Sequence, residues 1–199
     1  MAALAANPLD ANEMVRRQKE SRPMLNCTKK SQSNAEEIRS TCLESDFKTC
    51  IAATALARYL AEHVDDVPIS VRTRMLDTHD FIMLMVPLIE EPPWTRRRET
   101  ADKQVLDIVT TSKMVWEKYI DNEWAEVPSR DLLKITKCEA QCWFTLYFLT
   151  CSKSCRESYG LNSFRKEQML RLRKYLNEVM TDQLPVLSDV MSRSGLGQR

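Results

Sequence analysis

The sequence predicts an all-α fold with one small β-hairpin, and three observations support this prediction. Only three glycines occur in 199 residues, and Gly195 and Gly197 lie close to the C-terminus. Phosphate-binding loops and tight turns use glycine, because they need positive φ angles or a close approach of the backbone. The chain is rich in Leu, Ala, Met, Glu, Arg and Lys, which favour helices. Apolar residues also recur at helical spacing in several long segments.

The expected elements begin after a polar stretch. Residues 1–33 show little periodicity and are predicted to form a flexible arm. A helical-repeat-like domain is expected over residues 34–191, with a disordered tail at 192–199. The first helix of this domain is expected to begin at the capping residue Asn34 and to end before Pro68.

The centre of the predicted domain combines helices with one hairpin. Ser70 is expected to cap a short helix, and Phe81 to Glu90 form a nearly all-apolar helix, which indicates burial. Large apolar and charged residues then alternate around Asp121 and Asn122. This alternation predicts a two-stranded hairpin at about 114–127.

The C-terminal part of the domain is again predicted to be helical. Ser129 is expected to cap a helix that continues to about Cys151, and Asn162 or Ser163 to cap another that runs to Met180. Amphipathic and nearly all-apolar helices joined by short loops are typical of stacked helix pairs. The domain is therefore predicted to be armadillo- or HEAT-like.

Composition and charge exclude several classes of function. The chain has 29 basic and 28 acidic residues and a net charge of +1, so no long-range field attracts nucleic acid or anionic lipid. The longest apolar run, residues 81–89, is far shorter than the roughly 20 residues that span a bilayer. No Walker loop, G-x-G-x-x-G or G-x-S-x-G motif occurs. We therefore expect no nucleic-acid partner, no membrane insertion, no cofactor and no catalytic residue.

Four cysteines provide a chemical alternative. Cys138 and Cys142, followed by Cys151 and Cys155, have the number of thiols that a tetrahedral zinc site needs. Each pair is separated by three intervening residues and lies in a helical pattern, whereas zinc knuckles use Cys-x-x-Cys. We expect ordinary helical cysteines and no metal, and we keep a zinc- or thiol-dependent protein as an alternative. The odd total of seven cysteines indicates reduced thiols in the cytosol.

The candidate contacts with protein partners are one tryptophan and five basic residues. Trp94 follows two prolines, and Arg96 and Arg97 come shortly after it. The other three, Arg165, Arg171 and Lys174, lie on one predicted helix. The helix group also fits the solvated face of an amphipathic helix. Trp94 either anchors a loop in the core or is exposed as a partner contact. The functional interpretation is a basic groove that recognises an acidic peptide.

Two segments of the chain resemble a known family. The first reads SVRTRMLDTH at 70–79, followed by EEPPWTRR at 90–97. The second reads YGLNSF at 159–164, followed by DQLPVL at 182–187. In this order and separation they are similar to the central helical region of the zinc finger MYND domain-containing protein 10 family. The shared residues are mainly packing and turn residues, so they indicate lineage and fold.

The resemblance implies a cytoplasmic adaptor or co-chaperone-type scaffold that helps to preassemble axonemal dynein arms for motile cilia. The implied partners are a leucine-rich-repeat dynein assembly factor, Hsp90-linked immunophilin chaperones and dynein chains. The implied location is the cytoplasm, including centriolar satellites or the cilium base. No MYND-like series of Cys-x-x-Cys pairs occurs, so no zinc function is expected. A generic helical scaffold without a ciliary role is the other alternative.

Overall fold

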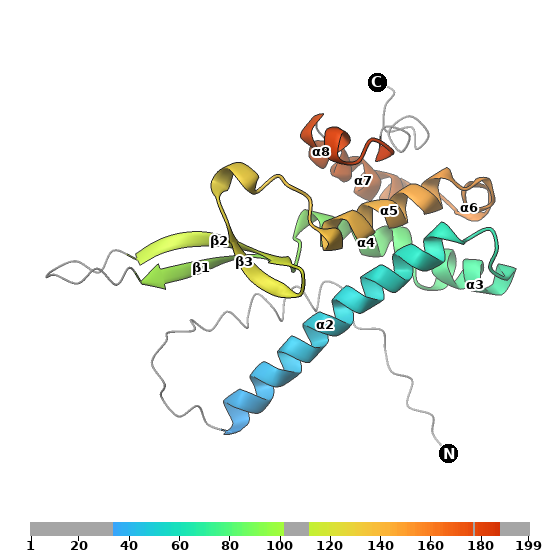
Figure 1. The fold of residues 1–199 in the computed structure, drawn as a ribbon. Coiled ribbons are helices and arrows are strands. Elements are labelled where there is room, and N and C mark those ends of the chain that lie inside the picture. The colour runs from blue at the N-terminus through green and yellow to red at the C-terminus, as the bar shows by residue number, and fades with distance from the viewer. Residues whose placement is uncertain (1–33, 102–111, 177, 188–199) are drawn as a thin grey trace, which may run out of the picture.

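The computed structural model describes residues 34–101, 112–176 and 178–187 (Figure 1). The predicted arm at 1–33 and the predicted tail at 192–199 lie outside the described residues. The helices are α2 (Asn34–Glu62), α3 (Ile69–Thr73), α4 (Phe81–Glu90), α5 (Lys137–Cys151), α6 (Lys153–Ser158), α7 (Ser163–Arg171) and α8 (Glu178–Gln183). The strands are β1 (Thr95–Ala101), β2 (Ser112–Ile120) and β3 (Glu123–Val127).

Helix α2 confirms the predicted first helix, and it connects the helical body with the sheet. Its buried residues Ala57 and Ala61 are small, which permits close packing against α5. Further towards its N-terminus, the ring of Phe47 stacks on Trp124, with 5.5 Å between centroids, and meets Tyr119 edge-on. The first turns of α2 are largely exposed and extend away from the body (Figure 1).

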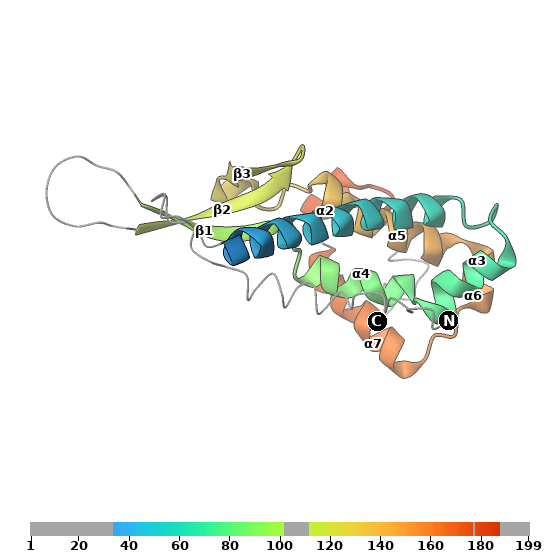
Figure 2. The same cartoon turned by 90° about the horizontal axis from the view of Figure 1, so that it is seen from below.

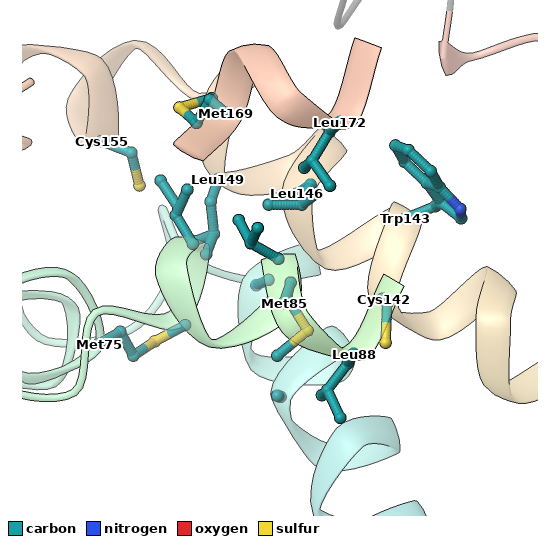
Figure 3. Packing of buried hydrophobic residues seen from close by; sticks show 14 of the residues in the cluster. Met75, Met85, Leu88, Cys142, Trp143, Leu146, Leu149, Cys155, Met169 and Leu172 are labelled. Atoms are coloured by element: carbon teal, nitrogen blue, oxygen red, sulfur yellow. The ribbon is translucent and has the colours of Figure 1, made fainter. Parts of the chain in front are cut away.

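The predicted buried helix is α4, and it lies against α5 and α7 in the core. Figure 3 shows Met85 and Leu88 of α4 in one cluster with Leu146, Leu149 and Met169. Each buried side chain of this size stabilises the fold by roughly 1.5–3 kcal/mol. The layout of these helices beside the sheet is visible in Figure 2. Among the described residues no helix is long and apolar enough to cross a membrane.

The start predicted for α5 was wrong. Ser129 begins a short 3-10 turn, Ser129–Asp131, and α5 itself begins at Lys137. Thr136 and Glu139 form a capping box, in which each side chain accepts a hydrogen bond from the other residue's backbone N–H. The Thr-x-x-Glu pattern that produces this start is present in the sequence.

The sheet has three antiparallel strands in the order β1-β2-β3, and not the two that were predicted. The β2–β3 hairpin is confirmed, with Asp121 and Asn122 at φ angles of 50° and 70°. Positive φ at both turn positions matches the twist of a two-residue hairpin. Strand β1 adds to β2 with Thr95 opposite Lys118.

The predicted helix to Met180 is interrupted. Helix α7 is capped by Asn162, as expected, and ends at Arg171. A 3-10 turn, Leu172–Tyr175, follows, and Leu176 leaves the helical region with φ −85° and ψ 75°. The described fold is therefore mostly helical with a small three-stranded sheet. Armadillo-like stacking of helix pairs is not confirmed and stays a prediction.

Candidate functional site

A cleft of about 390 Å³ is the candidate site, and we call it the Trp94 cleft. It lies where the end of α4, the sheet, the segment before α5 and the C-terminal elements meet. Its apolar wall comprises Leu88, Ile89, Pro92, Trp94, Leu132, Leu133, Ile135, Trp143, Tyr175 and Met180. Its polar residues are Glu90, Lys118, Lys134, Glu139 and Lys174. Apolar walls with a few polar groups are typical of binding pockets.

Trp94 is placed in the wall of the cleft by the chain on either side of it. Pro92 and Pro93 follow the end of α4, and a helix does not continue through prolines. The carbonyl oxygen of Trp94 accepts a hydrogen bond from the N–H of Tyr119 at 2.9 Å, which fixes the residue beside β2. Its ring is fully buried, and its indole Nε1 has no hydrogen-bond partner in the described part of the chain. An unpaired buried donor costs about 1–3 kcal/mol.

The floor of the cleft contains a buried ion pair. The Lys118 ammonium donates hydrogen bonds to Glu139 Oε1 at 3.0 Å and to the carbonyl oxygen of Lys134 at 2.8 Å. The other oxygen of Glu139 accepts a hydrogen bond from the Thr136 N–H at 2.6 Å. One carboxylate therefore neutralises Lys118 and caps α5, which joins β2 to the start of that helix.

A second carboxylate lies at the rim of the cleft. Glu90 Oε2 accepts a hydrogen bond from Arg171 Nη2 at 2.6 Å, and its Oε1 accepts one from Arg171 Nε at 3.1 Å. The Lys174 ammonium lies 3.4 Å from the same Oε1. The Lys174 side chain is 60% exposed, whereas Glu90 is only 11% exposed. A mostly buried carboxylate thus holds two cations at the edge of an apolar wall.

The structure brings three of the six predicted contact residues together. Trp94 and Lys174 line the cleft, and Arg171 pairs with Glu90 at its rim. Trp94 fits the core-anchoring alternative, because a fully buried ring offers no exposed surface to a partner. Arg171 belongs to α7, whereas Lys174 lies in the following turn, so the predicted single helix is divided between them.

Arg96 and Arg97 lie on the sheet and not in the cleft. Arg96 is opposite Glu117 and Arg97 is opposite Trp116 in the β1–β2 register, and neighbouring residues of a strand face opposite sides. Arg96 Nε donates to Glu117 Oε2 at 2.8 Å. Arg97 covers the Trp116 ring at 4.4 Å from its centroid. The two arginines therefore face different surfaces.

Arg165 lies at the other end of α4 from the cleft. Its Nε and Nη2 both contact Asp80 Oδ2 at 2.8 Å, and its Nη1 donates to the carbonyl oxygen of Gly160 at 2.7 Å. The guanidinium also covers the Tyr159 ring at 4.4 Å from its centroid. These contacts hold two segments of the same chain together.

The sequence interpretation missed several residues of the cleft. Lys118 and Glu139 lie in segments that were assigned to a hairpin and to a helix interior, and nothing in their spacing indicates that they meet. The signal that was available is the capping box at Thr136, which places Glu139 in the first turn of α5. Leu133 was included in a helix but lies exposed at the cleft before α5 begins.

The tetrahedral zinc site that the four cysteines could form is wrong for a geometric reason, whereas the thiol-dependent alternative stays a prediction. Cys138 and Cys151 are the second and last residues of one α-helix, and 13 residues at 1.5 Å each separate them by about 20 Å. A zinc ion with bonds of about 2.3 Å does not bridge that distance. In the described segments no group of three or more His, Cys, Asp or Glu side chains is arranged to hold a metal. Burial also raises the pKa of the Cys142 thiol well above its ordinary value, which disfavours the reactive thiolate.

Comparisons with known proteins provide evidence independent of the cleft. No protein-family model matches the chain, and no solved structure matches it. Five curated proteins match. One of them is the zinc finger MYND domain-containing protein 10 homolog of Drosophila melanogaster, which is 31% identical over 144 residues. The match covers 72% of this chain and 28% of the fly protein. The chain therefore spans little more than a quarter of that relative.

Proposed function

The chain is a relative of the zinc finger MYND domain-containing protein 10 family, and from that premise we propose that it is a non-catalytic adaptor in the preassembly of axonemal dynein arms. In this proposal it acts in the cytoplasm of cells that build motile cilia, including centriolar satellites or the cilium base. It binds protein segments at the Trp94 cleft and presents them to other factors. The relationship over 144 residues is the observation that carries the ciliary role.

The structure supports the binding mechanism through the construction of the cleft. Its wall is apolar, and it is bordered by Lys118, Glu139, Glu90 and Lys174. The helices α4 and α5 pack against each other beneath it, so the wall is held by the core of the domain. A stack of helix pairs of the armadillo type, as the sequence predicts, would supply the same kind of rigid surface.

The proposed partners follow from the family resemblance. They are dynein chains, Hsp90-linked immunophilin chaperones and a leucine-rich-repeat assembly factor. An adaptor of this kind contacts a client and a chaperone at the same time, and it needs no reaction of its own. The proposal includes no zinc, no nucleic acid and no membrane anchor.

The test is a pull-down with the tagged chain from the cytosol of cells that are building motile cilia. Mass spectrometry identifies the bound proteins, and a tagged helical protein of similar size and charge serves as the control. Specific recovery of dynein chains or chaperones supports the proposal. Recovery of none of them by the folded chain would favour the generic helical scaffold.

A further inference from the structure

The donors and acceptors of the Trp94 cleft indicate what kind of segment it binds. We infer that the cleft binds a short acidic segment of a partner protein, with a large apolar side chain against the wall and a carboxylate at the rim beside Lys174. This inference rests on the proposed function as a protein-binding adaptor. It adds the chemical class of the bound segment and names the residues that select it.

The acceptors that line the cleft are already in use. Glu139 accepts hydrogen bonds from Lys118 and from the backbone N–H of Thr136. Glu90 accepts two hydrogen bonds from Arg171, and the Lys174 ammonium lies near one of its oxygens. Each carboxylate is therefore already neutralised by a cation of the same chain, and a cationic segment would have to compete with that cation.

One donor of the cleft is accessible and only partly used. Lys174 has three N–H donors, and its ammonium is 3.4 Å from Glu90 and 60% exposed. A carboxylate of a bound segment would accept hydrogen bonds from this ammonium. A basic segment would be repelled by it.

The charged residues at the cleft also favour an acidic segment. The lining contains three lysines, Lys118, Lys134 and Lys174, and two glutamates, Glu90 and Glu139. Arg171 adds a positive charge beside Glu90, and Asp131, 3.1 Å from Lys134, adds a negative one. The cleft and these two neighbours therefore have an excess of one positive charge, which the exposed Lys174 places at the rim. Charge complementarity of this kind selects partners and speeds their encounter.

The apolar wall indicates a peptide and not a free anion. Leu133 is exposed at the cleft, and Ile89 and Ile135, which also line it, are partly exposed. In Figure 3 the Trp143 ring lies at the edge of the core cluster, with its indole nitrogen turned away from Leu146. An apolar side chain of a bound segment would remove the exposed surface of Leu133, Ile89 and Ile135 from water, which contributes about 25 cal/mol per Å².

The experiment is a calorimetric titration of the full chain with two blocked hexapeptides. One alternates Glu and Leu, and the other alternates Gln and Leu, so they differ in charge and not in size. We expect the acidic peptide to bind at least about tenfold more tightly at moderate salt. Lys174→Gln should weaken that binding by about threefold to tenfold.

Lys153→Gln is the matched control, because Lys153 is an exposed lysine on α6 that is 3.8 Å from Glu157. It makes the same change of charge outside the cleft and should leave the affinity unchanged. Lys174 and Lys153 are both exposed, so both variants should fold like the wild type. Equal affinity for the two peptides would overturn the inference, as would an equal loss in Lys153→Gln.

The titration and the pull-down separate the two proposals. Selective binding of the acidic peptide, together with a pull-down that recovers no dynein or chaperone, would support the cleft chemistry and contradict the ciliary role. A pull-down that recovers these proteins equally well with Lys174→Gln, together with no peptide selectivity, would support the ciliary role and overturn the cleft inference.

Discussion

Asp80 and Arg165 are joined by two contacts of 2.8 Å, although they are 85 residues apart in the sequence. Asp80 has a left-handed backbone with φ 46° and caps α4 by accepting a hydrogen bond from the Met83 N–H. The same carboxylate accepts one from the Tyr159 hydroxyl at 2.8 Å. This residue therefore fixes the start of α4 against the start of α7.

Asp80→Ala should destabilise the fold by on the order of 2–4 kcal/mol, because it removes a helix cap and a charge-assisted pair and places Ala at positive φ. Asp80→Asn should cost about half as much, since Asn also caps helices and tolerates this backbone. Urea unfolding followed by circular dichroism measures both changes, with Lys153→Ala as the control. A loss below about 0.5 kcal/mol for Asp80→Ala would contradict this role.

The two arginines of β1 should differ in their effect on stability. Arg96 pairs with Glu117, whose side chain is 5% exposed, and its guanidinium lies 3.9 Å from the Trp124 ring centroid. Arg96→Ala should cost about 1–3 kcal/mol, whereas Arg97→Ala should cost below about 1 kcal/mol, since Arg97 covers only the Trp116 ring. Thermal unfolding of the two variants measures the difference. Equal losses would show that the contacts of Arg96 add nothing.

Lys118→Met should be strongly destabilising, by on the order of 3 kcal/mol, because it leaves Glu139 mostly buried without its cation. Lys118→Met combined with Glu139→Gln should recover part of that loss. Urea unfolding of the two single variants and the double variant gives the coupling between the residues. Additive losses in the double variant would mean that the pair is not coupled.

The sequence predicted the elements whose signal is local. Helix α4 follows from its continuous apolar run, and the β2–β3 hairpin follows from the alternation around Asp121 and Asn122. Strand β1 was missed because its residues, TRRRETA, are polar and it is stabilised by pairing with β2 and by stacking on distant tryptophans. Such pairing depends on the register between segments, which local patterns do not contain.

Local sequence patterns also do not show which distant residues meet in the Trp94 cleft. Trp94 was recognised as unusual because it follows two prolines, but its burial depends on β2, which fixes its backbone at Tyr119. Lys118 has the appearance of an ordinary strand lysine, and its burial results from the position of Glu139. Arg165 and Arg171 were grouped as one basic face, yet their partners Asp80 and Glu90 lie at opposite ends of α4. The identity of those partners required the fold.

Thiol reactivity should follow burial. Cys42 is exposed and Cys142 is buried, and burial raises the pKa of the Cys142 thiol well above its ordinary value. Iodoacetamide at pH 8 should therefore modify Cys42 first and Cys142 only when the chain unfolds, as peptide mass spectrometry would show. Modification of Cys142 at the same rate in the folded chain would contradict the packing of α5.

The same pKa shift gives a pH dependence of stability. The Cys142 thiol stays protonated in the folded chain at pH values where the unfolded chain loses that proton, near pH 8.5. The stabilisation that this pKa difference gives the folded chain is fully present below that pH, and it falls as the pH rises above it. The free energy of unfolding should therefore decline between about pH 8 and 10, and Cys142→Ala should decline less steeply. If the free energy of unfolding declined equally in the wild type and in Cys142→Ala, other groups would be the cause of the pH dependence.

The central claim is that the chain binds protein partners through the Trp94 cleft, and one comparative pull-down tests it most directly. The baits are the wild-type chain, Lys174→Glu and Lys153→Glu, each shown to be folded by circular dichroism, in cytosol from cells building motile cilia. We predict that dynein chains or their chaperones are recovered with the wild type and with Lys153→Glu, and are depleted with Lys174→Glu. Equal recovery with all three baits would contradict the claim.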